Sequence, residues 1–290
     1  MTLQKAYRLA QKQLEEMGID SATLDTQVLI CNSLNISLEK FFLKQNDELS
    51  PAALEKIKIM INRRAQNQPI AYILGHKEFF GLDFLVNQNV LIPRPETERL
   101  VELALDRIKH HEESIKNKKS LIHDLEYLIL DVGTGCGNII IALAKNTNGQ
   151  FFASDISVAA LKVAQKNAMM HHVDDKIKFI QSDLFSNIKN QKFDLILANL
   201  PYVPTADLDE KSIRFEPQKA IFAQDNGAEI IKKFLGQAPA FLNKNGLILL
   251  ELDPRNAMDI KNYTAKYFPK TKIKLSKDLA GLWRYLSIEN

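Results

Sequence analysis

The stretch LDVGTGCGN, residues 130–138, ends a run of apolar residues in three alternating glycines. Residues 127–132 have the composition of a buried strand, and residues 138–145 have that of a helix. Glycines let the backbone turn sharply and approach a ligand closely, and the first N–H groups of the following helix point toward that ligand. The stretch therefore predicts a strand, a ligand-binding turn and a helix that together begin an α/β domain.

Strands and helices alternate after this turn. Strands are expected at residues 150–155, 177–181, 193–198 and 247–252, and helices at residues 158–169 and 228–241. Such alternation predicts a mostly parallel sheet with helices on both faces. Ligands of these sheets bind outside the carboxyl ends of the strands, so the residues directly after each strand are the candidate site.

The residues after the second and third strands favour a nucleoside ligand. Asp155 follows the glycine turn by about twenty residues, a spacing from which a carboxylate accepts hydrogen bonds from ribose hydroxyls. Alternatively, Asp155 caps the helix that begins near Val158. Asp183 and Leu184, after the third strand, are placed to give an adenine ring a polar contact and an apolar face. A dinucleotide-binding fingerprint would instead have glycine at the position of Asn138.

The fourth strand ends in a tetrapeptide of Asn199, Leu200, Pro201 and Tyr202. Pro201 has a fixed φ and biases Leu200 toward an extended conformation, which holds the Leu200 carbonyl in place. This carbonyl and the side-chain oxygen of Asn199 are two acceptors for a planar NH₂ group, on which the Tyr202 ring can pack. Two such acceptors can direct the lone pair of an amide nitrogen toward an electrophile. The alternative interpretation is a purely structural strand end.

The first ninety residues predict helices. Apolar residues recur at helical spacing from Leu3 to Met17, and Ser50 and Pro51 are typical of an N-cap and a first helical residue. Residues 24–34 and 38–43 can each form another short helix. We therefore expect a helical domain at residues 1–75.

Residues 76–92 are expected to form a hairpin-like linker, because residues 79–84 and 84–92 are two β-prone runs. The sequence PRPE then starts a helix at Pro95, within a second domain of residues 93–290. Arg94 and Glu96 beside this helix start either bind substrate or pair with each other. Further on, the polar residues 110–124 predict a loop, and Trp283 is expected in the core of a C-terminal strand.

The composition restricts the class of protein. Of 290 residues, 46% are hydrophobic and 25% are charged, as in ordinary globular proteins. No apolar run approaches the roughly 20 residues that span a bilayer, and residues 1–20 lack the features of a signal peptide, so we expect a cytoplasmic protein. A net charge of +3 gives no sign of a nucleic-acid partner. Cys31 and Cys136 are too few for a disulfide framework, and no histidines have metal-ligand spacing, so no metal is expected.

Several of these segments together resemble a known family. The GTGCG turn, Asp155, the SDLF segment at residues 182–185 and the N-x-P-Y tetrapeptide are similar to those of class I methyltransferases, which use S-adenosylmethionine. Residues 63–105, which include the segment IPRPETE, resemble the release factor glutamine methyltransferases. These enzymes methylate N5 of the glutamine in the Gly-Gly-Gln loop of peptide chain release factors. The resemblance implies a Rossmann-like domain with a mostly parallel seven-stranded sheet, preceded by a helical domain that recognises the substrate.

The resemblance also implies roles for individual residues. S-adenosylmethionine would be bound by Gly133, Thr134, Gly135, Cys136, Gly137, Asp155, Asp183, Leu184 and Asn199. The substrate glutamine would be held by Asn199, Leu200, Pro201 and Tyr202, with Asn199, Pro201 and Tyr202 as the catalytic residues. The chain departs from the family at Leu200, where a proline is usual, and in the segment LLELDPRN, residues 249–256, which lacks a glycine after its acidic residue. Leucine still supplies the backbone carbonyl.

Two other functions are open at this point. An RNA or DNA adenine-N6 methyltransferase would present a similar planar nitrogen to the same acceptors, but it normally has a basic groove lined by aromatic residues, of which the sequence gives no sign. A binding protein would retain the nucleoside pocket without catalysis, yet ligand retention requires neither Asn199 nor Tyr202. We therefore expect release factors as partners, with no membrane association and no direct nucleic-acid binding.

Overall fold

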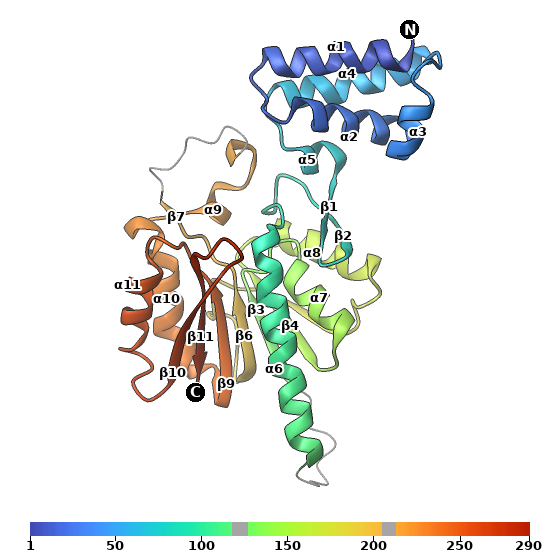
Figure 1. Ribbon diagram of the computed structural model, residues 1–290. Helices are drawn as coiled ribbons and strands as arrows, with labels where there is room; N and C mark the ends of the chain where they lie inside the picture. Colours follow the sequence, from blue (N-terminus) through green and yellow to red (C-terminus); the bar gives the residue numbers. More distant parts are fainter. Residues whose placement is uncertain (118–126, 205–212) are drawn as a thin grey trace. The chain divides into compact units, whose positions relative to one another are not determined.

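The computed structural model describes residues 1–117, 127–204 and 213–290 of the chain (Figure 1). The chain divides into two compact units. The first is Met1–His76 together with residues 213–215, and the second contains the other described residues. Each unit has its own hydrophobic core.

The first unit is a bundle of short helices. They are α1 (Leu3–Glu16), α2 (Ala22–Leu34), α3 (Leu38–Leu43), α4 (Pro51–Ala65) and α5 (Ile70–Leu74). Thr2, Ser37 and Ser50 cap three of them by accepting hydrogen bonds from backbone N–H groups. Leu14 and Leu29 are fully buried between α1, α2 and α4, which lie side by side in Figure 1. The helices expected at the start of the chain are confirmed.

A β-hairpin of β1 (His76–Phe79) and β2 (Leu82–Leu85) follows the bundle. Phe79 and Phe84 of this hairpin are buried in the core of the second unit. The expected β runs at residues 79–84 and 84–92 are both wrong. Phe80 and Gly81 form the turn between β1 and β2, and β2 ends at Leu85, after which the Asn87 side chain accepts a hydrogen bond from the Asn89 N–H in a local turn. The hairpin is therefore anchored in the second unit and is not a free linker.

A seven-stranded sheet forms the centre of the second unit. Its strands are β3 (Leu128–Val132), β4 (Gln150–Asp155), β5 (Ile177–Gln181), β6 (Phe193–Ala198), β9 (Leu242–Glu251), β10 (Lys272–Lys277) and β11 (Trp283–Glu289). They lie in the order β10-β11-β9-β6-β3-β4-β5, with β11 antiparallel to both neighbours and every other neighbouring pair parallel. The mostly parallel sheet and the five expected strands are confirmed. The chain runs outward from β3 through β4 and β5 and returns on the other side of β3 as β6, so the strand order reverses beside β3.

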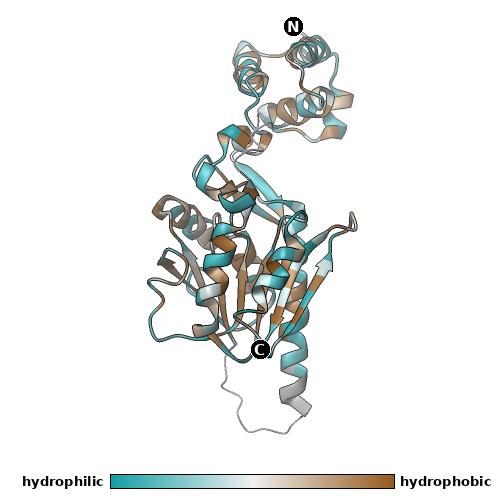
Figure 2. Cartoon of the chain, turned by 90° about the vertical axis from the view of Figure 1, so that its left-hand side faces the viewer, coloured by the Kyte–Doolittle hydropathy of each residue, from teal (hydrophilic) through white to brown (hydrophobic). Residues whose placement is uncertain are grey.

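Helices cover both faces of the sheet. One face packs against α6 (Glu98–Asn117), α7 (Asn138–Asn146) and α8 (Val158–Met170), and the other against α10 (Glu229–Gln237) and α11 (Ala257–Thr264). Successive residues of β3 enter opposite cores, Ile129 the first and Leu130 the second, because side chains alternate along a strand. Figure 2 shows hydrophobic residues concentrated in the strands between these helices.

Short elements connect the layers. They are η1 (Pro95–Thr97), β7 (Val203–Pro204), η2 (Ile213–Phe215), α9 (Gln218–Ile221), β8 (Phe222–Ala223), η3 (Asp225–Gly227) and η4 (Ala238–Ala240). β7 and β8 form a small parallel pair directly after the tetrapeptide. None of the helices among the described residues is long and apolar enough to cross a membrane.

Two local expectations are wrong. The first eight residues of the expected loop at 110–124 continue α6 to Asn117, because no glycine or proline interrupts residues 98–117; residues 118–126 lie outside the described part of the chain. Trp283 begins the expected C-terminal strand, but it is 40% exposed and the Lys277 ammonium lies over its ring. The buried aromatic residue of that strand is Tyr285.

Asn167 of α8 joins the hairpin to the glycine turn. Its side-chain nitrogen donates to the carbonyls of Leu85 at 3.0 Å and Cys136 at 2.8 Å, and its oxygen accepts from the Leu85 N–H at 2.8 Å. The side chain is fully buried, so no solvent replaces these bonds. One asparagine thus fixes the loop after β3 relative to α8 and β2.

Replacement of Asn167 by alanine leaves the Cys136 carbonyl and two backbone groups of the part-exposed Leu85 without their partner, so we expect a loss of about 2 kcal/mol in the free energy of unfolding. Urea titration followed by fluorescence of Trp283, the single tryptophan of the chain, reports on the second unit. The control is Asn146→Ala, because Asn146 donates one bond within α7 and its loss should cost less than about 1 kcal/mol. Equal midpoints for the two variants would contradict this role of Asn167.

Candidate functional site

The carboxyl ends of β3, β4, β5 and β6 surround a pocket of about 660 Å³ in the second unit. Among the predicted site residues, ten line it: Gly133, Thr134, Gly135, Cys136, Asp155, Asp183, Leu184, Asn199, Leu200 and Pro201. Gly137 and Tyr202 do not. Gly137 is instead the N-cap of α7, and Tyr202 follows the lining residues in the chain. Sequence positions from four strand ends are thus brought to one cavity at the reversal of strand order.

The glycine turn is shaped to leave open space next to the tetrapeptide. The N–H groups of Gly133 and Thr134 donate to the Ser154 carbonyl of β4 at 2.8 and 2.9 Å. Gly133 has a φ of +76°, and a Cβ on it would lie 3.1 Å from Cδ2 of Leu200. A side chain at this position would therefore be strained and would press on the tetrapeptide.

Asp155 is held by backbone donors. Its carboxylate accepts from the Gly135 N–H at 2.9 Å and from the Ser157 N–H at 2.8 Å. The alternative interpretation, in which Asp155 caps the helix near Val158, is wrong, because the Ser157 side chain is the N-cap of α8. Burial raises the pKa of Asp155, and the backbone N–H donors act in the opposite direction.

Asp131 is a further carboxylate beneath the glycine turn, and sequence reasoning missed it. Its Oδ2 accepts from the Thr134 hydroxyl at 2.6 Å, whereas its buried Oδ1 has no partner among the described residues. Burial raises the pKa of Asp131 to about 7; the Thr134 hydrogen bond lowers it and the charge of Asp155 raises it. The available signal was an acidic residue inside an apolar strand.

The residues after β5 lie in different environments. Leu184 is buried and lines the pocket. Asp183 is half-exposed and forms an ion pair with the Lys233 ammonium of α10 at 2.8 Å. Lys233 also lines the pocket, and nothing in the local sequence indicated it.

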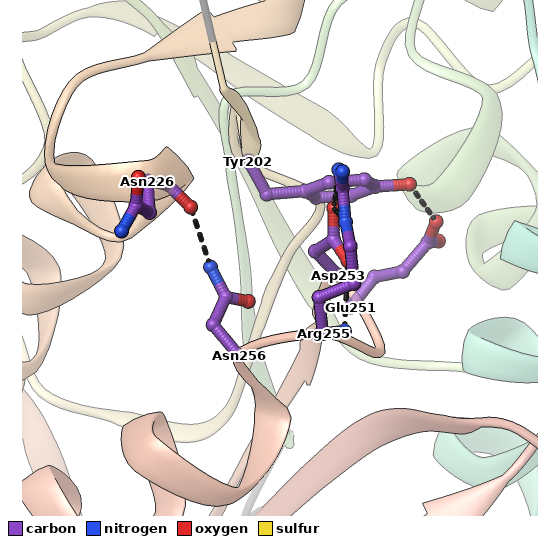
Figure 3. Close-up of polar contacts among 6 residues, drawn as sticks. All are labelled: Tyr202, Asn226, Glu251, Asp253, Arg255 and Asn256. Carbon is purple, nitrogen blue, oxygen red and sulfur yellow. Dashed lines mark hydrogen bonds and ion pairs between the residues drawn. The ribbon is translucent and has the colours of Figure 1, made fainter. Parts of the chain in front are cut away.

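A chain of hydrogen bonds lies behind the tetrapeptide. The Asn199 side-chain nitrogen donates to Oγ1 of Thr97 at 3.0 Å, and the Thr97 hydroxyl donates to Oε2 of Glu251 at 2.7 Å. The Tyr202 hydroxyl donates to Oε1 of the same carboxylate at 2.9 Å (Figure 3). Thr97 and Glu251 are both buried, and neither was predicted as a site residue. A carboxylate at the end of an apolar strand was the one local signal.

Electrostatics fix the direction of the Tyr202 bond. Burial and the nearby Glu251 charge both raise the pKa of Tyr202, so the phenol keeps its proton and donates it. Burial also raises the pKa of Glu251, while the Thr97 and Tyr202 hydroxyls and the Arg284 guanidinium lower it. The Tyr202 hydroxyl therefore holds the tetrapeptide through its hydrogen bond to Glu251. Because the hydroxyl keeps its proton, it does not act as a base.

A tight turn at residues 225–227 supports the backbone of Tyr202. Gly227 has a φ of +85°, and a Cβ on it would lie 1.8 Å from the Tyr202 carbonyl oxygen. The Asn256 side chain, at the N-terminus of α11, donates to the Asn226 carbonyl at 2.8 Å (Figure 3). Figure 3 also shows the ion pair of Asp253 and Arg255 that follows β9.

Arg94 lines the pocket but does not take Glu96 as its ion-pair partner. Its guanidinium binds Oε1 of Glu216 at 2.6 Å, and Oε2 of Glu216 accepts from the Ile92 N–H at 3.0 Å. The Glu96 carbonyl accepts from the Tyr285 hydroxyl at 2.7 Å. Within the described part of the chain, no group of three His, Cys, Asp or Glu side chains is arranged for a metal ion.

Comparison with known proteins identifies the family. Residues 5–75 match the family described as the PrmC N-terminal domain, and residues 123–277 match a methyltransferase domain. The release factor glutamine methyltransferase of Rhodopirellula baltica is 35% identical over 280 residues, which cover 94% of this chain and 90% of that protein. The chain belongs to the release factor glutamine methyltransferase family. The homologue from Geobacter sulfurreducens is 34% identical over 87% of this chain and 84% of its own.

Family membership confirms the resemblance read from the sequence and the class I methyltransferase domain. The chain also matches longer proteins: it is 36% identical to the bifunctional methyltransferase of Rickettsia typhi over 84% of its own length, but the match covers 49% of that protein. The chain thus spans about half the length of these Rickettsia relatives.

Solved structures support the fold. A methyltransferase from Pyrococcus furiosus aligns with a TM-score of 0.51 at 20% identity, over 79% of this chain and 98% of that chain. The hMettl16 catalytic domain, solved with an RNA hairpin, aligns with a TM-score of 0.54 at 18% identity, over 79% of this chain and 81% of that chain. Identities this low carry information on the fold alone.

The raised pKa of Asp131 predicts a pH dependence of stability. The folded protein keeps a proton on Asp131 up to about pH 7, whereas an unfolded chain releases it near 3.8, so rising pH between these values favours unfolding. The loss is at most about 1.4 kcal/mol per pH unit. Asp131→Asn keeps the shape and cannot ionise, so the difference in unfolding free energy between variant and wild type should grow in favour of the variant from pH 5 to pH 7. Urea titrations at several pH values measure it, and a constant difference would contradict the buried, protonated carboxyl.

Proposed function

We propose that this protein transfers the methyl group of S-adenosylmethionine to N5 of the glutamine in the Gly-Gly-Gln loop of peptide chain release factors. The observation that carries the proposal is the pocket in which the glycine turn of β3 and the polar strand end of β6 face one cavity. Family membership supplies the substrate class. The adenine-N6 alternative has no observation in its favour beyond a shared fold.

The donor fits the chemistry of the residues around the glycine turn. Asp155 retains lone pairs for ribose hydroxyls beyond its two backbone donors, and Leu184 offers an apolar surface to an adenine ring. The space that a Cβ on Gly133 would fill lets backbone and ligand approach closely. When bound, the donor supplies an electrophilic methyl group on a sulfonium centre.

The tetrapeptide is suited to an amide acceptor. An amide nitrogen is a poor nucleophile because its lone pair is delocalised into the carbonyl. Asn199 Oδ1 and the Leu200 carbonyl bind the two N–H groups and orient this lone pair toward the methyl group. Pro201 keeps the Leu200 carbonyl in position, and Tyr202, which does not line the pocket, holds the end of the tetrapeptide through its hydrogen bond to Glu251. The leucine at position 200 does not affect this scheme, because only its carbonyl takes part.

The chain is proposed to consist of a helical domain at residues 1–75, a linker at residues 76–92 and a methyltransferase domain at residues 93–290. The helical domain is proposed to recognise the body of the release factor. A glutamine side chain offers few atoms for recognition, so a second contact on the same partner adds selectivity. Because Phe79 and Phe84 are buried in the second unit, the boundary that preserves the catalytic core lies before the hairpin.

The direct test incubates purified release factor with the protein and labelled S-adenosylmethionine, followed by tryptic-peptide mass spectrometry. We expect one added methyl group on the Gly-Gly-Gln peptide. Asn199→Ala should lower turnover on the order of 10²- to 10³-fold, as for loss of one preorganised polar group, and change donor affinity less. Methylation of unpaired adenines in RNA, with release factor unmodified, would replace the proposal by the adenine-N6 alternative.

A chain that begins at His76, the first residue of the hairpin, tests the role proposed for the helical unit. We expect it to bind the donor normally and to lose most activity on intact release factor, because the second contact is gone. Activity on a short Gly-Gly-Gln peptide should change much less. Equal losses on peptide and protein would mean that the helical unit supports the fold of the second unit.

A further inference from the structure

We infer that Thr97 and Glu251 are positioning residues that set the orientation of the Asn199 carboxamide, so that its oxygen is the atom presented to the substrate amide. The inference rests on the proposed function and extends it to residues outside the tetrapeptide. It begins from three consecutive hydrogen bonds, Asn199 to Thr97, Thr97 to Glu251 and Tyr202 to Glu251. Their directions are not independent of one another.

The Glu251 carboxylate determines the direction of the first step. The two oxygens of Glu251 each accept one hydrogen bond, and both bonds come from hydroxyl groups. Tyr202 supplies one, because its phenol stays protonated. Thr97 supplies the other at 2.7 Å, and this uses the single proton of its hydroxyl.

The threonine hydroxyl then determines the direction of the second step. Once its proton is directed at Glu251, Oγ1 of Thr97 can only accept a hydrogen bond. The amide group of Asn199 must therefore face Thr97 with its nitrogen, at 3.0 Å, and its Oδ1 is turned the other way. Asn199 lines the pocket, so its oxygen is the group available to a planar NH₂ donor there.

An Asn199 carboxamide in the reversed orientation could not bind the NH₂ group of this substrate. It would present N–H donors to the N–H donors of a glutamine side chain, and the site would then lose one of its two acceptors. Electron density at ordinary resolution does not distinguish the amide oxygen from the nitrogen, but the proton count along this chain of bonds does. Thr97 comes from η1 and Glu251 from the end of β9. Two distant segments thus fix the rotation of the Asn199 carboxamide about its last side-chain bond.

The same carboxylate explains why Tyr202 and Asn199 act as one unit. Glu251 is 1% exposed, and a buried carboxyl group without hydrogen-bond partners is costly. Both hydroxyl donors are needed, and the Arg284 guanidinium adds a favourable charge nearby. Loss of the Thr97 hydroxyl or of the Tyr202 hydroxyl therefore disturbs Glu251, which is the hydrogen-bond partner of both.

The test compares Thr97→Val with Thr97→Ser by steady-state kinetics on release factor. Valine has the shape of threonine and no hydroxyl, so Asn199 loses its fixed orientation, and we expect kcat to fall about 10²-fold with little change in the donor dissociation constant. Serine keeps the hydroxyl and should restore at least a tenth of the wild-type kcat. The matched control is Thr264→Val: Thr264 is equally buried, but its hydroxyl binds the Ile260 carbonyl within α11, and kcat should stay near wild type.

Glu251→Gln provides a second, independent variant. Both hydroxyls, of Tyr202 and of Thr97, donate to residue 251 in the wild type. Glutamine has only one acceptor oxygen, so it can accept from one of these hydroxyls, and its nitrogen must donate to the other. If its nitrogen donates to Thr97, the Thr97 hydroxyl turns to Asn199 and inverts the carboxamide. We expect kcat to fall at least tenfold while donor affinity is retained.

The outcomes separate this inference from the proposed function. If the wild-type protein methylates the glutamine but folded Thr97→Val and Glu251→Gln keep wild-type kcat, the positioning role is overturned and the function stands. If Thr97→Ser is as impaired as Thr97→Val, packing and not the hydroxyl is responsible, which also overturns the inference. If the wild-type protein leaves the glutamine unmodified, the proposed function itself has failed.

Discussion

The buried carboxylate of Glu251 is the constraint on which the acceptor side of the site depends. It lies at the end of β9 and accepts hydrogen bonds from hydroxyls that come from η1 and from the loop after β6. The carboxyl group would lose a partner if either bond were missing, so both segments hold the tetrapeptide in place. Thr97 lines the pocket together with Asn199, Leu200 and Pro201.

The donor side of the pocket depends on the backbone in a similar way. The glycine turn binds to Ser154 of β4, Asp155 binds back to the turn, and Asn167 ties the turn to α8 and to the hairpin. Gly133 lies where any side chain would press on Leu200. The glycine turn and the tetrapeptide therefore approach each other closely at Gly133.

Local sequence patterns were sufficient for five strands of the central sheet, the glycine turn and ten of the residues that line the pocket. Each of these features depends on neighbours in the chain, such as apolar runs, glycines and the residue that follows a strand. The hydrogen bonds behind the site were not predictable in this way, because Thr97 and Glu251 are 154 residues apart and meet only through the order of the strands. Lys233 was missed for the same reason, whereas Asp131 had a local signal as an acidic residue inside an apolar strand. The end of β2 and the length of α6 were misjudged because weak local preferences were read without the tertiary packing.

Neutron diffraction from deuterium-exchanged crystals tests the central claim most directly, since it locates the protons along the chain from Asn199 to Tyr202. The account predicts deuterium on Thr97 Oγ1 and on the Tyr202 hydroxyl, both directed at a Glu251 carboxylate that carries none. It also predicts a deuterated Asn199 nitrogen facing Thr97. A map with the Asn199 oxygen toward Thr97, and the threonine deuteron directed at that oxygen, would contradict it.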